Sequence, residues 1–260
     1  MSQASSSAPD RRPDRGVRLL DVDPELGAAL EGSELVEARE LAVLPTLALA
    51  AGAWDVEQLA HAPGVSGEVH GFLVLDGAVT ASASIVGRAC DRLVFAGGLV
   101  LVDGAPEMSI PVQWSWSAVT RTRVAILDDR LVVIGARWPR LLGAILNRAG
   151  QQSRQALLYQ AISQLPRVED RLLALMWVIA DRCGVVRSDG IHVPLPVTHQ
   201  ALARMIGAQR PTVTLGLGRL AEEGLLRPET GGWVIDPDSA AQFRSPDGAP
   251  DPDHQPAAST

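Results

Sequence analysis

Residues 198–235 constrain the fold more than any other stretch of this sequence. They contain two short runs of helical spacing separated by Gly207, and then two strand-like runs separated by Pro-Glu-Thr-Gly-Gly. Glycine suits the left-handed conformation that ends a helix. Thr198 suits the position before the first helix, where its hydroxyl can accept a backbone N–H. The stretch therefore predicts two helices joined by a tight turn and followed by a hairpin, which is a winged helix-turn-helix.

The second helix of this motif is expected to begin around residues 209–211, because proline in a first turn breaks no helical hydrogen bond. Val213, Leu217 and Leu220 recur at i, i+4 and i+7 and would pack inward. The opposite face is then available to another surface. It contains Gln209, Arg210, Thr212, Thr214 and Arg219.

These residues follow the pattern T-x-x-x-[LI]-A-x-x-[LIV]-G-x-[ST]-R-x-T-V, continuing to L-x-x-x-G-L-[IL]. The matching positions are Thr198, Leu202, Ala203, Ile206, Gly207, Arg210, Thr212, Val213, Leu220, Gly224, Leu225 and Leu226. Residues 198–226 therefore resemble the DNA-binding domain of the Crp/Fnr superfamily of bacterial transcription regulators. Two positions depart from that pattern: Gln209 replaces a small hydroxyl residue, and Ala201 replaces an acidic one.

The resemblance implies that the second helix enters the major groove of DNA, where an arginine can bond two acceptors of guanine. Arg210 is the candidate for this contact. Pro211 and Leu215 hold two other base-reading positions of the family, so reading there would depend on apolar contact. The expected DNA-contacting set is completed by Thr198, Gln209, Thr212, Thr214, Arg219 and Arg227. Of these, Thr212, Thr214, Arg219 and Arg227 are placed for phosphate contacts, with ordinary solvated surface as the alternative.

From about residue 37 to residue 134, short apolar or alternating runs lie between glycines and prolines. Many short strands without regular helices between them predict a β-roll or barrel. Residues 72–79 and 117–128 resemble strands of the cyclic-nucleotide-binding β-roll that precedes the Crp-type helix-turn-helix. Leu99 and Val112 stand where the family has its ribose-binding glutamate and phosphate-binding arginine. The resemblance therefore implies a roll that does not bind a cyclic nucleotide in the usual way.

Residues 138–165 form a long helical candidate that ends before Pro166. A loose heptad seam follows it through Leu142, Ile145, Ala149, Gln152, Ala156 and Tyr159. We expect this seam to pair two copies of the chain, because a dimer can read two half-sites. The alternative is a helix that packs only within its own chain. Residues 167–183 predict a further amphipathic helix, and residues 17–30 a short leading helix.

The expected fold is α+β, with an N-terminal jelly-roll-like β-roll, a long dimerisation helix and a C-terminal winged helix-turn-helix. The 260 residues suffice for such domains. The expected boundaries are a disordered tail at 1–15, a sensor roll at 16–136, the long helix at 137–165, the DNA-binding domain at 166–236 and a disordered tail at 237–260. No apolar run is long enough to span a membrane, and the N-terminus lacks a signal core, so we expect a cytoplasmic protein.

The sequence contains no phosphate-binding loop, nucleophile elbow or zinc-protease motif, so we expect no enzyme. No cofactor or metal is expected, since two cysteines are too few for a four-cysteine iron–sulfur site. The expected partners are double-stranded DNA and a second copy of the chain, with RNA polymerase and an unidentified effector as further candidates and no membrane. The alternative function is a sensor of a small molecule or protein, whose winged helix contacts protein.

Overall fold

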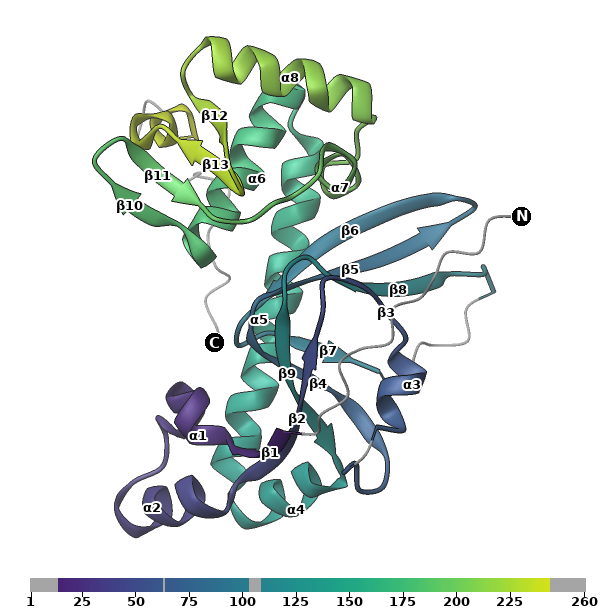
Figure 1. Ribbon diagram of the computed structural model, residues 1–260, viewed down its shortest axis with the longest axis vertical. Coiled ribbons are helices and arrows are strands. Elements are labelled where there is room, and N and C mark those ends of the chain that lie inside the picture. Colours follow the sequence, from purple (N-terminus) through teal and green to yellow (C-terminus); the bar gives the residue numbers. More distant parts are fainter. Residues whose placement is uncertain (1–13, 63, 103–108, 244–260) are drawn as a thin grey trace, which may run out of the picture.

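The computed structural model describes residues 14–62, 64–102 and 109–243. Two antiparallel sheets form a β-roll in the N-terminal half of this described region (Figure 1). The first has the strand order β1 (Asp14–Arg18), β2 (Val43–Leu49), β9 (Thr122–Asp128), β4 (Val69–Asp76) and β7 (Leu99–Leu101). The second has the order β3 (Gly52–Trp54), β8 (Gln113–Ala118), β5 (Ala78–Ile85) and β6 (Arg88–Phe95). The predicted α+β architecture with a roll is confirmed.

The first sheet is buried on both faces. Phe72 and Val74 of β4 belong to a core between the two sheets, together with Val79 and Val94 of the second sheet. Leu73, between them in sequence, points to the opposite face and joins a second core. Alternate residues of a strand point to opposite faces of a sheet. A strand covered on both sides is therefore nearly continuously apolar, as β4 is.

Helices cover the outer face of the first sheet. They are α1 (Leu19–Val22), the 3-10 helix η1 (Pro24–Gly27), α2 (Gly32–Leu41), α4 (Asp129–Arg137) and the long α5 (Pro139–Gln164), while α3 (Val56–Ala60) follows β3. The buried side chains of α4 and α5 in this core are Leu131, Ile134, Leu141 and Ile145. No helix among the described residues is both long and apolar enough to cross a membrane.

Several sequence-based expectations for the N-terminal half are wrong. Residues 17–30 do not form one leading helix, because Arg18 pairs with Val43 of β2 and a 3-10 turn begins at Pro24. Regular helices do interrupt the strands: α3 lies between β3 and β4, where Asp55 caps it by accepting from the Gln58 amide at 3.1 Å. Local apolar spacing did not separate such short helices from strands, because a distant strand or a single cap decides the outcome.

The expected disordered tails are wrong where the structure describes them. Residues 14–15 belong to β1, and residues 237–243 form the 3-10 helix η2 (Pro237–Phe243). Ser239 is buried and its hydroxyl accepts a hydrogen bond from Trp177 Nε1 at 3.1 Å. This contact orders a polar segment that could not fold alone. Residues 1–13 and 244–260, the rest of those tails, lie outside the described residues.

Most of the expected dimer seam of α5 faces its own chain. Ile145 and Tyr159 are buried, Ala149 packs against the roll, and Leu142 lies over Gly135 of α4. The side chain of Gln152 bonds both backbone groups of Leu99, at 3.1 and 2.9 Å. Of the six expected residues, Ala156 is exposed. The predicted register is therefore wrong, since heptad spacing alone does not say which face of a helix meets its own domain.

The C-terminal domain begins with α6 (Val168–Cys183). A four-stranded antiparallel sheet follows, in the order β10 (Val185–Arg187), β11 (Gly190–Val193), β13 (Gly232–Ile235) and β12 (Leu226–Glu229). Helices α7 (His199–Met205) and α8 (Arg210–Glu222) lie between β11 and β12 in sequence. Their apolar faces share one core with Leu172, Leu175, Met176 and Ile179 of α6. The core of this domain is therefore built around α6.

The C-terminal domain touches the roll through α7 and β6 (Figure 1). Asp91 of β6 is buried, accepts a hydrogen bond from the Ser82 hydroxyl at 2.7 Å, and lies 3.8 Å from Arg204 of α7. Leu93 of the roll and Tyr159 of α5 belong to the same apolar cluster as the C-terminal domain. The junction is thus both apolar and ionic.

Candidate nucleic-acid interface

The first helix of the motif starts and ends as its sequence predicts. The Thr198 hydroxyl accepts the Ala201 amide at 3.1 Å, which satisfies one of the orphan donors of the first turn. Leu202, Ala203 and Met205 are buried behind it. The turn then passes through Gly207, whose φ of +66° is easy for glycine and strained for other residues. α7 is therefore held at both ends by local chemistry.

The second helix presents one face to its own domain and leaves the other exposed. Val213, Leu217 and Leu220 are buried, as expected. Gly216 lets α8 approach α6 closely, since a Cβ there would lie 3.0 Å from Leu172 Cδ1. The exposed face begins at the first turn and contains Gln209, Arg210, Pro211, Thr212, Thr214, Leu215 and Arg219.

Arg210 is the first residue of α8 and is exposed. Its guanidinium makes no hydrogen bond or ion pair with any residue in the described part of the chain. The opposite end of the helix carries Glu222 and Glu223. The N-terminal end, where the helix dipole is positive, is thus the cationic end. An anion would approach α8 from this side.

The other expected contacts differ in how free they are. Thr212 and Leu215 are exposed. The Thr214 hydroxyl donates to the Arg210 carbonyl at 3.1 Å. Arg219 donates to Glu169 of α6 at 2.5 Å, and the Glu169 backbone amide together with Arg219 holds the pKa of that carboxyl below its usual range. Arg219 is therefore already engaged within its own domain.

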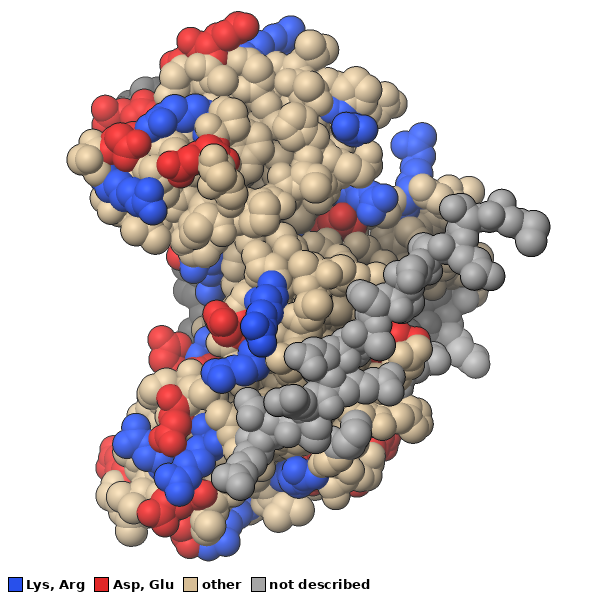
Figure 2. Space-filling view, in the orientation of Figure 1, with Lys and Arg blue, Asp and Glu red and all other residues tan. Residues whose placement is uncertain are grey.

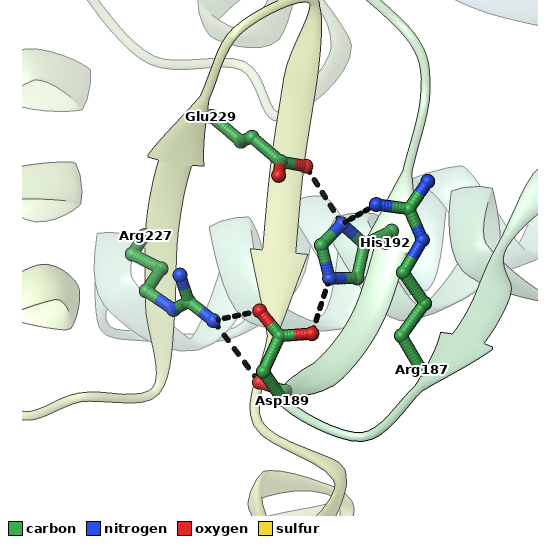
Figure 3. A network of polar contacts seen from close by, with 5 residues as sticks. All are labelled: Arg187, Asp189, His192, Arg227 and Glu229. Atoms are coloured by element: carbon green, nitrogen blue, oxygen red, sulfur yellow. Dashed lines mark hydrogen bonds and ion pairs between the residues drawn. The ribbon is translucent and has the colours of Figure 1, made fainter.

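Arg227 of the wing is engaged as well. The wing is the hairpin of β12 and β13, and Arg227 Nη2 lies 2.8 Å from Asp189 Oδ2 (Figure 3). The hydrogen bonds from Arg227 and His192 lower the pKa of Asp189 to about 2. Figure 2 shows arginines beside acidic side chains over the lobe that contains α8 and the wing. The charge of this lobe is mixed, so Arg210 stands out through its lack of a partner.

His199 is a residue of this surface that the sequence reasoning missed. Its Nδ1 lies 3.0 Å from Thr214 Oγ1, and its ring is 6.2 Å from that of Trp233. Because the Thr214 hydroxyl proton is donated to Arg210, the histidine nitrogen is the donor to Thr214. His199 therefore links the start of α7, Thr214 of α8 and the wing. Its position directly after the cap Thr198 was the available signal.

The C-terminal geometry agrees with a known family. Residues 166–239 match the family model of the Crp-like helix-turn-helix domain. This segment is a Crp-like helix-turn-helix domain. The Global nitrogen regulators of Synechocystis sp. and Nostoc sp. are each 39% identical to the chain over 56 residues. That similarity covers 22% of this chain and 25% of each relative, so the chain matches about a quarter of their length.

The fold extends beyond the Crp-like domain. A CRP/FNR family transcriptional regulator from Thermus thermophilus superposes with a TM-score of 0.54 and 24% identity, over 76% of this chain and 96% of that one. A CooA mutant from Carboxydothermus hydrogenoformans superposes with a TM-score of 0.60 and 17% identity, over 92% of this chain and 100% of that one. The roll, the long helix and the Crp-like domain are thus arranged as in the fold of these two proteins.

A small cleft lies on the roll side of the Crp-like domain, between the turn after β6 and helices α5 and α6. It is lined by Phe95, Gly97, Arg148, Gln152, Gln155 and Arg182. Its volume of about 20 Å³ has room for one or two water molecules. Arg148 is paired with Asp23 at 3.0 Å and with Glu25 at 2.8 Å. Leu99, beside the cleft, is buried.

Proposed function

We propose that this chain is a sequence-specific DNA-binding transcription regulator whose helix α8 enters the major groove. The observation that carries the proposal is the state of Arg210, which is exposed and, within the described part of the chain, unpartnered. It begins a helix that Val213, Leu217 and Leu220 anchor from behind. An arginine held in this way can bond guanine O6 and N7 together. The Crp-like domain supports the same function.

Phosphate contacts would position the helix. Thr198 is exposed, and its hydroxyl, which accepts the Ala201 amide, still has its own proton to donate. Gln209 and Thr212 are exposed at the same end of α8. Arg219 and Arg227 would have to exchange Glu169 and Asp189 for phosphate, so we assign them a smaller share of the binding energy.

We propose that two chains pair through the exposed stripe of α5. This stripe contains Leu146, Gly150, Ser153 and Leu157, which recur at i, i+4, i+7 and i+11 as in a coiled coil. Leu146 and Leu157 are 63% and 66% exposed, and Gly150 allows close approach of a second helix. A two-fold dimer would present two α8 helices to half-sites about 34 Å apart on an inverted repeat.

We propose that the roll does not bind a cyclic nucleotide in the usual way. Leu99 is 3% exposed and lies in the apolar core, so it offers no hydrogen bond to a ribose. Arg148 is already neutralised by Asp23 and Glu25. An unpaired phosphate in such surroundings is costly. Control by an effector would therefore need a ligand of different chemistry.

A mobility-shift assay against fragments of the source genome tests the DNA-binding proposal. Arg210→Ala should weaken binding to the selected fragment about ten- to a hundredfold, since a good arginine–guanine contact is worth about 1–3 kcal/mol. Arg121→Ala, which removes the same charge from an exposed position of the roll, should change little. Equal binding by all three proteins would show that Arg210 does not read bases. No binding at low salt would favour a protein-binding role for the winged helix.

A further inference from the structure

Five charged or titratable residues form a cluster at the wing (Figure 3). We call it the wing cluster; it contains Arg187 of β10, Asp189 of the following turn, His192 of β11, and Arg227 and Glu229 of β12. Two of its members, Asp189 and Arg227, are in contact although they are 38 residues apart in sequence. The cluster therefore joins the β10–β11 hairpin to the first strand of the wing.

His192 is the centre of the wing cluster and is 4% exposed. Its Nε2 lies 2.7 Å from Asp189 Oδ1, and its Nδ1 lies 2.7 Å from Glu229 Oε2. Arg187 Nη1 also approaches Nδ1, at 3.1 Å. The residues opposite His192 in the neighbouring strands are Val185 of β10 and Val234 of β13, which do not titrate. Among the described residues, the charged side chains that contact the ring are thus Arg187, Asp189 and Glu229.

The two partners of His192 Nδ1 make opposite demands. A carboxylate only accepts hydrogen bonds, so Glu229 requires a proton on Nδ1. A guanidinium only donates, so Arg187 requires the lone pair of Nδ1. One nitrogen cannot serve both at once. With Asp189 bound at Nε2, the ring is an imidazolium when it holds Glu229 and is neutral when it accepts from Arg187.

We propose that His192 is a positioning residue of the wing, whose Nδ1 proton selects between Glu229 and Arg187. In the protonated state, Glu229 is held against β11 and its charge is compensated. In the neutral state, Glu229 is released and its charge is uncompensated. This inference rests on the proposed function where it concerns DNA, and on the wing cluster alone where it concerns the wing.

The consequence for DNA follows from the position of Glu229. It is two residues after Arg227 on β12, so both side chains leave the same face of an exposed strand. A released carboxylate beside Arg227 would repel the phosphates that this face meets, whereas a carboxylate held by the imidazolium would not. Protonation of His192 Nδ1 should therefore tighten DNA binding at the wing by about threefold, the size of an exposed charge contribution.

The free protein provides the first test. In protein labelled with ¹⁵N-histidine, His192 should show protons on both ring nitrogens in acid and lose the Nδ1 proton as the pH rises. Hydrogen exchange of residues 226–232, corrected for intrinsic rates, should become faster in the same interval. Glu229→Gln should remove the change in exchange and preserve the fold, since Glu229 is partly exposed and glutamine has its shape. A wing whose exchange ignores this titration would refute the inference.

DNA affinity provides the second test. The ratio of the wild-type affinity for DNA to that of Glu229→Gln should be about threefold higher in acid than in base. His192→Gln should behave like Glu229→Gln, and His61→Gln, in the roll, like the wild type. His199 is present in Glu229→Gln and in the wild type, so its own titration cancels in their comparison. A protein that passes the first test but binds no DNA would refute the proposed function and leave the wing inference standing. Equal pH dependence of the wild type and Glu229→Gln would refute the link to DNA.

Discussion

Replacing Gly218 with alanine should stabilise the Crp-like domain, whereas replacing Gly216 should not. Both residues lie inside α8, where glycine costs about 0.8–1 kcal/mol relative to alanine because it loses more backbone freedom. A Cβ at position 218 meets no atom within 4 Å. Nearly the whole helix-propensity gain, about 1 kcal/mol, should therefore appear as added stability.

Position 216 has the same propensity but no free space. A Cβ there would lie 3.0 Å from Leu172 Cδ1 and 3.3 Å from Val168 Cγ1, so α6 and α8 would have to move apart slightly. Overpacking of this kind costs about 1–3 kcal/mol, which cancels or exceeds the gain. The two variants should therefore differ by about 1–3 kcal/mol, although the substitution is the same.

Urea unfolding followed by circular dichroism measures this difference, with the slope of the transition as a check that the denatured state is unchanged. In thermal melts, Gly218→Ala should raise Tm by about 2–4 °C. Equal stabilisation by both variants would refute the close α6–α8 packing. Gly218 shares an exposed face with Pro211 and Leu215, which precede it by seven and three residues. If Gly218→Ala is more stable but binds DNA less well, the glycine serves close approach to the groove.

Acid should weaken the wing: the folded-state pKa of Asp189 is lowered from 3.8 to about 2, so its stabilisation is complete above pH 3.8 and is lost as the pH falls toward 2. Asp189→Asn should reduce the fall in Tm over this pH range in a series of thermal melts. An equal fall in the wild type and in Asp189→Asn would contradict the assignment. Asp91→Asn and Arg204→Gln should be coupled by about 0.5 kcal/mol in a double-mutant cycle, whereas additive effects would exclude the ion pair at the junction. Leu157→Glu should convert a dimer into monomers in sedimentation and weaken binding to a DNA with two half-sites. Val133→Glu, at a similarly exposed position of α4, should do neither. A dimer that persists in Leu157→Glu would rule out the α5 stripe as the interface.

The helix-turn-helix could be predicted from the sequence because its determinants are local. The Thr198 cap acts on Ala201, three residues away, and Gly207 controls its own backbone conformation. The buried spacing of Val213, Leu217 and Leu220 defines one helix face without reference to the rest of the chain. The exposure of Arg210 followed from that spacing.

The tertiary structure alone decided which groups on those faces are already occupied. Arg219 meets Glu169 across 50 residues of sequence, and His192 meets Glu229 across 37. The inward face of α5 was also decided this way, because the roll covers Ile145 and leaves Leu157 exposed. Periodicity states that a helix has an apolar side, whereas the partner of that side is a non-local contact. Such contacts depend on how the elements pack, which short-range spacing does not record.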